Sequence, residues 1–292
     1  MRQIRKLYLQ NAAGVRIDLN GAEGVYATDL TGFGSQTSNS YGDLGRGFYL
    51  DVNPVRAQTT LGFTLKFTRK ATAYAQYLQL TQWIAAAGGG LLLLYEPPGT
   101  ALYYRRVELA RLTKKEKTRV GWLEIPVELK PLTPWYLPSS VAAAAGEIPE
   151  DAMRYDLGRY GRGRYLASHV PAFAAQIEPM GDEPAAFSVT YAGAASDLVL
   201  SLVGLSTGAV YGRCEIDYEF LTGDVLEYSS APRDSYCRVR RGGTVIDLEG
   251  RLDLTGEPYI RMPVSEGCLL QLSASEMHGS AEIRASYYFS TV

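Results

Sequence analysis

Histidine, cysteine and serine are the side chains most often used for nucleophilic catalysis and for binding zinc, and their spacing here supports neither use. The chain has two histidines, His169 and His278, and neither lies in an H-x-x-x-H pattern or beside a cysteine. Ser168 precedes His169, but neighbouring residues of a strand point to opposite faces of a sheet, so they cannot form a nucleophile–base pair there. The sequence therefore predicts no catalytic residue, no metal site and no cofactor.

Three glycine-containing segments resemble fragments of ligand-binding loops. Gly-x-Gly occurs at residues 32–34 and 45–47, without the lysine and the following helix of a phosphate loop. DLNG at residues 18–21 resembles the start of a calcium loop but lacks the distal bidentate glutamate. Turns explain all three segments, because glycine and Asn-Gly favour tight turns.

Four carboxylates lie close together in the second half of the chain: Asp247, Glu249, Asp253 and Glu257. A glycosidase needs two facing carboxylates, and a calcium ion can also be held by such a group. Charged residues at alternate strand positions are more often a solvated face, and we favour that interpretation.

Arginine, tyrosine and glycine alternate in RYGRGRY at residues 159–165, a composition that can bind single-stranded nucleic acid by charge and stacking. The sequence pI of about 5.8 is far from the basic value expected of such proteins, which favours a structural arm or an interface strand. Residues 1–140 carry 17 Lys and Arg against 10 Asp and Glu, a net charge of +7, and residues 141–292 carry 12 against 21, a net charge of −9. This asymmetry either favours ordered self-association or reflects drift in surface composition.

Three widely spaced cysteines, Cys214, Cys237 and Cys268, make no disulfide framework, so we expect free, buried thiols in a reducing cytosol. The basic N-terminus leads into only a short apolar run, which does not fit a signal peptide. The longest apolar stretch, residues 84–95, is broken by three glycines and is far shorter than the ~20 residues that span a bilayer. We therefore expect a protein that is made in the cytosol and has no membrane partner.

Hydrophobic periodicity predicts one helix in the first half. Residues 71–87 contain no Pro or Gly and carry apolar side chains at i, i+3 and i+4 spacing. Three glycines at 88–90 end this pattern, since glycine readily takes the left-handed conformation that caps a helix. A helix of this length gains its stability from packing, so we expect a sheet beneath it.

Strand patterns surround this helix. Residues 59–67 alternate between apolar and polar, and residues 101–112 and 118–130 predict a long β-hairpin with the polar tip KKEK at 114–117. Pro126 interrupts the second of these strands, which indicates an edge or a bulge because proline cannot donate to a ladder.

The second half predicts short strands without a helix, in a pattern typical of a jelly roll. We expect strands at residues 187–191, 198–203, 213–220, 224–229, 236–241, 244–248, 259–262, 268–274 and 282–289.

The fold class that these patterns predict is mainly β, with two domains. Residues 1–138 form an N-terminal β-sandwich with one α-helix and the long β-hairpin. Residues 139–152, rich in Ala, form a linker. Residues 153–292 form a C-terminal jelly-roll (galectin-like) β-sandwich.

The order of these elements resembles the distal tail protein (Dit) family of long-tailed bacteriophages. The similarity is carried by LYLQNAAG at residues 7–14, IDLNG at residues 17–21, the single helix, the strand at 91–95 and the hairpin that ends in PWY at 134–136. The second half, closing on residues 283–289, is similar to the C-terminal domain of such proteins. The resemblance spans nearly the whole chain.

The resemblance implies a homohexameric ring at the virion tail tip, made in the cytoplasm of a bacterial host and encoded by a phage or a prophage. Such a ring joins the tail tube protein to the tail-tip hub protein and lets DNA pass. The C-terminal domains would contact a receptor-binding protein or a host glycan. The family has no catalytic residues to carry over. We expect the hairpin to make the ring contacts, through Tyr103, Tyr104, Arg105, Arg106, Lys114, Lys115 and Lys117.

Two other functions stay open on the sequence. The C-terminal domain could be a carbohydrate-binding module or adhesin, whose tyrosines stack on sugar rings of host surface glycans. A glycoside hydrolase acting on cell-wall polymer would instead depend on Asp247 and Glu249.

Overall fold

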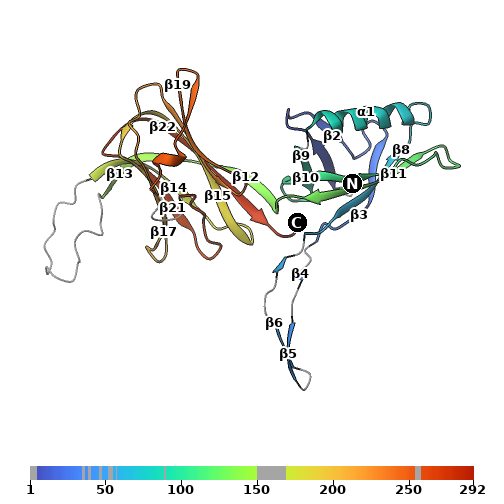
Figure 1. The fold of residues 1–292 in the computed structure, drawn as a ribbon, viewed down its shortest axis with the longest axis horizontal. Coiled ribbons are helices and arrows are strands. Elements are labelled where there is room, and N and C mark those ends of the chain that lie inside the picture. Colours follow the sequence, from blue (N-terminus) through green and yellow to red (C-terminus); the bar gives the residue numbers. More distant parts are fainter. Residues whose placement is uncertain are drawn as a thin grey trace. The chain divides into compact units, whose positions relative to one another are not determined.

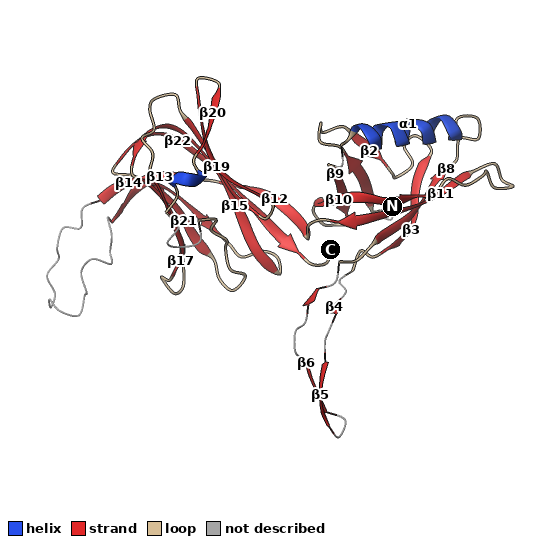
Figure 2. Ribbon diagram, in the orientation of Figure 1, coloured by secondary structure: helices blue, strands red, loops and turns tan. Residues whose placement is uncertain are grey.

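The structure is a computed structural model that describes residues 5–34, 37–38, 41–45, 48–51, 55–56, 58–88, 90–149, 169–253 and 258–292. The chain divides into two compact units, which we treat separately. Unit 1 comprises Met1–Leu137 and Phe289–Val292, and unit 2 comprises Pro138–Tyr288. Strands dominate both units, and α1 (Ala73–Ala86) is the only α-helix among the described residues (Figures 1 and 2). The mainly β architecture with one helix confirms that part of the prediction.

Unit 1 is built on seven antiparallel strands in the order β2-β1-β9-β10-β11-β8-β3. Their bounds are β1 Lys6–Gln10, β2 Arg16–Asp18, β3 Val25–Thr31, β8 Leu61–Phe67, β9 Leu91–Glu96, β10 Tyr103–Leu112 and β11 Leu123–Pro131. Between β3 and β8 the chain makes two short ladders nested in one hairpin, β4 (Thr37–Ser38) with β7 (Val55–Arg56) and β5 (Tyr41–Gly45) with β6 (Phe48–Asp51).

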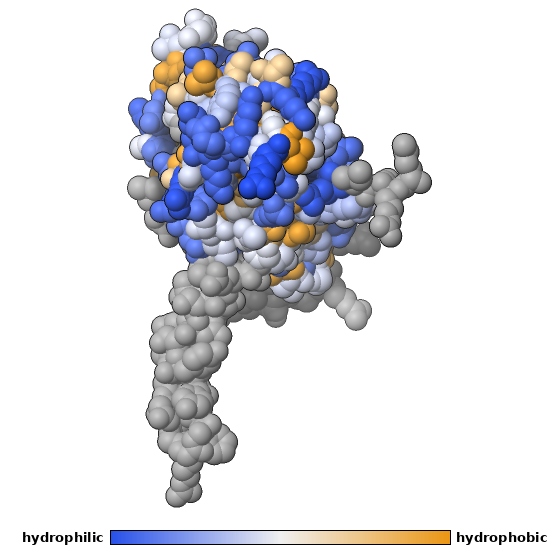
Figure 3. Space-filling model, turned by 90° about the vertical axis from the view of Figure 1, so that its right-hand side faces the viewer, coloured by the Kyte–Doolittle hydropathy of each residue, from blue (hydrophilic) through white to orange (hydrophobic). Residues whose placement is uncertain are grey.

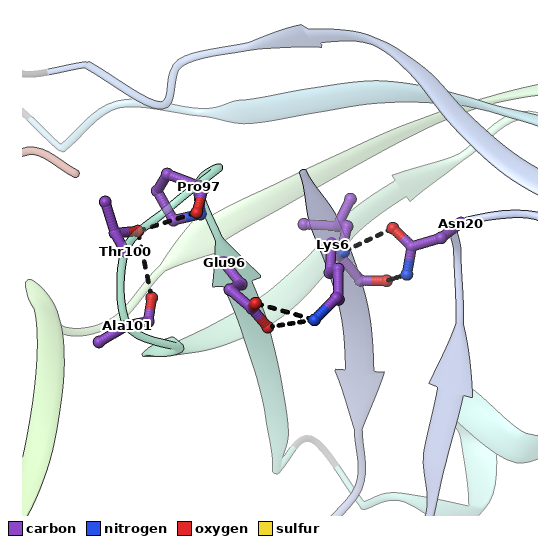
Figure 4. A network of polar contacts seen from close by, with 7 residues as sticks. Lys6, Asn20, Glu96, Pro97, Thr100 and Ala101 are labelled. Carbon is purple, nitrogen blue, oxygen red and sulfur yellow. Dashed lines mark hydrogen bonds and ion pairs between the residues drawn. The ribbon is translucent and has the colours of Figure 1, made fainter. Parts of the chain in front are cut away.

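The two ends of this seven-stranded sheet meet just after β2. Leu19 donates its N–H to Leu7 O at 3.1 Å and accepts the N–H of Ala27 at 2.9 Å, so it joins β1 to β3. The Asn20 side chain accepts the N–H of Leu7 at 2.7 Å and donates to Leu7 O at 3.0 Å (Figure 4). The layers expected of a sandwich are therefore supplied by one curled sheet, and β3 is not a free edge along its whole length.

The curled sheet encloses the core of unit 1. On β11 the side chains of Leu123, Ile125, Val127 and Leu129 are buried and alternate with partly exposed residues, as the two-residue period predicts. Helix α1 lies along one side of the sheet (Figure 1) and buries Ala73 and Leu80. It ends before Gly88, which has a φ of +58°, so the helix predicted over residues 71–87 is confirmed to within two residues.

The hairpin predicted over residues 101–130 is confirmed, but its second strand is shorter at the start. Residues 118–122 form a turn, in which Gly121 donates to Thr118 O at 2.8 Å with a φ of +87°. Pro126 lies where the β10 ladder ends: Thr113 donates to Pro126 O at 3.1 Å, so the missing N–H of Pro126 faces the start of the tip loop.

Unit 2 consists of two antiparallel sheets, in the orders β13-β14-β21-β16-β17 and β22-β15-β18-β19-β20. Their strands are β13 Ala144–Pro149, β14 His169–Ile177, β15 Glu183–Ser196, β16 Leu198–Gly204, β17 Val210–Ile216, β18 Val225–Ala231, β19 Asp234–Arg241, β20 Thr244–Asp247, β21 Cys268–Ser273 and β22 Glu276–Phe289. Side chains of both sheets meet in the core, for example Phe173 of β14 and Tyr191 of β15, whose ring centroids lie 6.2 Å apart.

Several local predictions for this part of the chain were wrong. Residues 259–262 do not form a strand, and Met262 makes only an isolated bridge to Ala185. Strand β17 ends at Ile216 although the alternation of residues continues to 220. Of the segment predicted as a linker, residues 144–149 pair with β14 as strand β13, and strand β12 (Trp135–Val141) covers its start. Local patterns failed here because pairing partners far along the chain decide which extended segments enter a sheet.

The three cysteines are free and buried, as the sequence predicts. Burial raises the pKa of the Cys237 thiol to about 12 and that of the Cys214 thiol to about 11, so both stay protonated at neutral pH. None of the helices in the described part of the chain is long and apolar enough to cross a bilayer.

The loop between β16 and β17 is held by one carboxylate. Glu266 accepts hydrogen bonds from the backbone and hydroxyl of Ser206, from Thr207 Oγ1 at 2.8 Å and from the Tyr211 hydroxyl. These bonds lower the pKa of Glu266 from 4.5 to about 2.

A pH prediction follows from this loop. A carboxyl group whose pKa is lower in the folded than in the unfolded protein stabilises the fold at pH values above its unfolded-state pKa. This stabilisation is lost as the pH falls toward the folded-state pKa. Protection of the loop amides against hydrogen exchange should therefore decline between about pH 4.5 and 2. Glu266→Gln is expected to remove that pH dependence, measured by hydrogen exchange at the Ser206 amide. Glu282→Gln, which removes an exposed pair with Arg284, is the control and should leave it unchanged. An unchanged pH profile in Glu266→Gln would contradict the assignment.

Candidate assembly surface

The residues predicted to make ring contacts lie on β10 and on the tip loop that follows it. Alternation along β10 decides which of them reach the surface. Arg106 and Glu108 are exposed, whereas Arg105 and Val107 point into the core of unit 1. The paired arginines at 105 and 106 therefore have opposite environments.

Arg105 is an internal residue. Only 9% of it is exposed, its Nε donates to Thr133 O at 2.8 Å, and its guanidinium lies 5.3 Å from the ring centre of Trp135. Arg105 Nη1 and Trp135 Nε1 are both buried without a hydrogen-bond partner. Burial lowers the pKa of Arg105 to about 10, so the charged form weakens the fold. Because the side chain is enclosed, it cannot touch a neighbouring subunit directly.

The two tyrosines at the start of β10 are half-buried against their own chain. The ring of Tyr103 packs edge-on against Phe289 at 5.2 Å, and the ring of Tyr104 stacks on Tyr136 at 5.7 Å. Each tyrosine leaves only part of its surface for a partner.

The tip loop is anchored to the start of α1 by Tyr74. Lys117 Nζ lies 4.8 Å and Lys114 Nζ 5.7 Å from the centre of the Tyr74 ring, and the Tyr74 hydroxyl donates to Glu116 Oε2 at 2.6 Å. Lys117 also donates to Lys70 O at 2.7 Å. The bond to Glu116 raises the pKa of Tyr74. Two of the three tip lysines are therefore used within unit 1.

Lys115 is exposed at the same tip. Lys114 and Lys117 are exposed as well, but Lys115 takes no part in the contacts with Tyr74 and Lys70 described above. The sequence analysis did not predict the contacts between Tyr74 and the tip loop, although it placed Tyr74 in the first turn of the helix. The pairing of that turn with a loop about 40 residues later leaves no local signal.

A shallow groove of about 430 Å³ lies on the outer face of the β10–β11 hairpin. The groove lies at a β-bulge, where the register of the β10–β11 pairing shifts between Leu109 and Arg111. A bulge bends its strand locally and separates the neighbouring side chains. The rim alternates in charge, with Arg111 Nη1 3.7 Å from Glu128 Oε1. The groove is lined by Glu108, Leu109, Ala110, Arg111, Glu128 and Lys130.

Hydrophilic side chains dominate the molecule seen from the side of unit 1, and apolar ones form small separate spots (Figure 3). We name the outward side chains of Tyr104, Arg106, Glu108, Arg111, Lys115, Glu128 and Lys130 the assembly surface. Mixed charge of this kind suits specific contact with another charged surface better than apolar burial.

Two of the four clustered carboxylates of unit 2, Asp247 and Glu249, accept hydrogen bonds within the unit. Asp247 accepts the N–H of Glu249 at 2.8 Å, and Glu249 accepts the hydroxyl of Tyr259 at 2.7 Å. No group of three or more His, Cys, Asp or Glu that could hold a metal ion occurs among the described residues. Glu257, Ser168 and the RYGRGRY segment at 159–165 lie outside the described residues.

Comparisons with known proteins find a matching family model and solved structures with a similar fold. The family model described as the distal tail protein, N-terminal domain, matches residues 6–132. A chain of the phage P2 baseplate in its activated conformation with Ca superposes with a TM-score of 0.66 at 15% identity, covering 99% of this chain and 100% of that one. The SPP1 Dit protein (gp 19.1) superposes with a TM-score of 0.55 at 11% identity, covering 98% and 99%.

At these identities the two structures show a shared fold. A search of curated proteins gives no match. The family match confirms the resemblance found in the sequence, and it covers the curled sheet, α1 and the β10–β11 hairpin. Residues 6–132 of the chain are therefore similar to the N-terminal domain of the distal tail protein (Dit) family.

Proposed function

We propose that this protein is a structural component of a phage tail tip, in which copies of unit 1 assemble as a homohexameric ring. The ring joins the tail tube protein to the tail-tip hub protein and lets DNA pass. The family match over residues 6–132 carries the proposal. The likeness of nearly the whole chain to a baseplate chain and to SPP1 Dit supports it.

The assembly surface provides the contacts in this proposal. Because Leu19 and Asn20 tie β1 to β3, addition of a neighbour's strand along that border is restricted. Side chains on the outer face of the hairpin are the alternative, and their alternating charge lets one surface recognise another by ion pairs. Unit 2, which we propose to be of the jelly-roll, galectin-like type, contacts a receptor-binding protein. The proposal assigns no enzymatic activity.

The mass of the assembled full-length chain tests this proposal. We expect native mass spectrometry to give six copies and negative-stain images to show six-fold rings. A chain that stays monomeric at its highest soluble concentration, or closes with another symmetry, would contradict it.

Two charge reversals test the assembly surface. Arg106→Glu combined with Lys115→Glu is expected to shift the ring to monomers at physiological salt, because both residues lie outside the core. The matched control is Arg213→Glu with Arg251→Glu, two exposed arginines of unit 2. Thermal unfolding of all variants separates lost assembly from lost folding. Intact rings in the Arg106 and Lys115 variant would place the contacts elsewhere.

A further inference from the structure

The Asn20–Gly21 dipeptide, just after β2, is chemically reactive as well as a turn signal. Of the four asparagines in the chain, only Asn20 is followed by glycine. Asparagine is a thermolabile side chain, because the backbone nitrogen of the next residue can attack its amide carbon. Glycine has no side chain to obstruct that attack. The sequence therefore makes Asn20 the asparagine of this chain that is most prone to deamidation.

Deamidation at this dipeptide needs only water. The Gly21 backbone nitrogen, after giving up its proton to solvent hydroxide, forms a bond to Asn20 Cγ. The bond between Cγ and the side-chain nitrogen breaks, and that nitrogen takes a proton from water and leaves as ammonia. Water then opens the resulting succinimide ring at either carbonyl, which leaves aspartate or isoaspartate at position 20. Both products replace a neutral amide by a carboxylate.

The fold engages every polar atom of the Asn20 side chain. Its Oδ1 accepts the N–H of Leu7 at 2.7 Å, and its Nδ2 donates to Leu7 O at 3.0 Å (Figure 4) and to Asp18 Oδ1 at 2.9 Å. An amide side chain has one carbonyl acceptor and two N–H donors, so this one is held on both sides. Deamidation makes Cγ tetrahedral and expels Nδ2. It therefore requires that the bonds to Leu7 and Asp18 break.

Gly21, the attacking residue, is held as well. Its φ is +105°, and a Cβ at this position would overlap the ring of Tyr26, so that ring lies directly against the glycine. Asn20 also forms an isolated bridge with Tyr26. A succinimide joins the two residues in one planar ring, which these contacts leave little freedom to form.

The same contacts join the two ends of the curled sheet of unit 1. We name the bonds of Asn20 to Leu7 and of Leu19 to Leu7 and Ala27 the sheet closure. A carboxylate at position 20 would lose both donors of the amide. It would also face the carbonyl oxygen of Leu7 and the carboxylate of Asp18, and like charges this close repel. Deamidation would therefore act on the bonds that close the sheet.

We propose that Asn20–Gly21 is a site of spontaneous deamidation that the sheet closure keeps unreactive, and that a chain deamidated while open does not form the closure again. Opening of this border by local unfolding exposes the dipeptide to reaction. Deamidation then makes a reversible opening permanent. The consequence is greatest for a protein that, as proposed above, works in a particle where it cannot be replaced.

The chemistry does not depend on the ring. Asn20, Gly21 and their partners all lie within unit 1 of a single chain. A protein that stays monomeric would show the same protection, so this proposal and the proposed function can fail separately.

Peptide mapping by mass spectrometry tests the protection. The full-length protein is aged in buffer and, in parallel, in urea, and the peptide with residue 20 is followed for the mass change from amide to acid. We expect conversion at Asn20 in urea and a rate on the order of tenfold lower or less in buffer, because the side-chain bonds must open first. Asn11, which precedes Ala12, is the internal reference and should convert slowly in both. Equal rates at Asn20 in buffer and urea, or no conversion there in urea, would overturn the proposal.

Asn20→Asp reproduces one product and tests its effect on the sheet closure. We expect faster hydrogen exchange at the Ala27 amide, which donates to Leu19 O. The matched control is Asn11→Asp, because Asn11 Oδ1 accepts the N–H of Val15 at 2.9 Å and an aspartate keeps that bond. Unchanged exchange at Ala27 in Asn20→Asp would overturn the proposal that the product cannot close the sheet. The ageing experiment uses the unaltered chain, so it decides the protection even where a variant folds poorly.

Discussion

Replacing Trp135 with alanine is expected to lower the free energy of unfolding of unit 1 by about 3–5 kcal/mol. Trp135 is fully buried. Its ring centre lies 5.7 Å from that of Phe33 and 5.8 Å from that of Tyr95. The Arg105 guanidinium lies 5.3 Å from the same ring centre. Truncation would leave a cavity among three side chains that belong to different strands and loops, so little of it can collapse.

Chemical denaturation followed by far-UV circular dichroism measures this change. Trp122→Ala is the matched control, because 36% of Trp122 is exposed in the turn before β11. We expect that control to cost less than about 1 kcal/mol, as surface substitutions usually do. Equal losses for the two tryptophans would show that Trp135 does not organise the core.

Arg105→Met tests the charged member of the same cluster, for which the opposite effect on stability is expected. Methionine keeps the packing on Trp135 but removes a buried cation whose Nη1 has no partner. Replacing such a charge by an apolar side chain of similar length is expected to leave stability unchanged or raise it by about 1–3 kcal/mol. A loss of stability would show that the guanidinium contributes a favourable interaction in the folded protein.

Gly279→Ala is expected to destabilise unit 2 by about 3 kcal/mol. A Cβ at Gly279 would lie 2.1 Å from the carbonyl oxygen of Ala192, which is backbone and cannot rotate away. Its ladder partner Gly193 is equally crowded, since a Cβ there would lie 2.0 Å from His278 O. The two glycines let β15 and β22 approach closely, and overpacking at this point must displace one strand.

Thermal and chemical unfolding of Gly279→Ala measure the effect. Gly250→Ala is the control, because a Cβ at Gly250 would meet nothing within 4 Å. A Gly279 variant as stable as the control would mean that the strands separate without cost.

Prediction from the sequence succeeded where one segment carries its own signal. The apolar spacing of residues 71–87 and the glycines that follow predicted α1, and the alternation of Leu123, Ile125, Val127 and Leu129 predicted β11. It failed where the partner decides the structure. Residues 259–262 look extended but pair only at Met262, and residues 144–149 look like a linker but enter a sheet as β13.

The same distinction between local and tertiary signals holds for the candidate assembly surface. Paired residues such as Arg105 and Arg106 must point to opposite faces of a strand, and this much follows from the two-residue period. Which arginine is buried depends on the sheets and loops that cover each face, and it is Arg105 that faces Trp135. The use of Lys114 and Lys117 to hold Tyr74 depends likewise on a contact between separate elements.

By itself the sequence determined a mainly β chain with one helix, three free thiols and a resemblance to the distal tail protein family. These follow from composition and from periods of two and 3.6 residues, which are local. Only the tertiary structure decided that the sheet of unit 1 closes through Leu19 and Asn20, and that Ser188, Glu227 and Arg284 line one groove. Strand register sets those contacts, and register is fixed by packing between segments tens of residues apart.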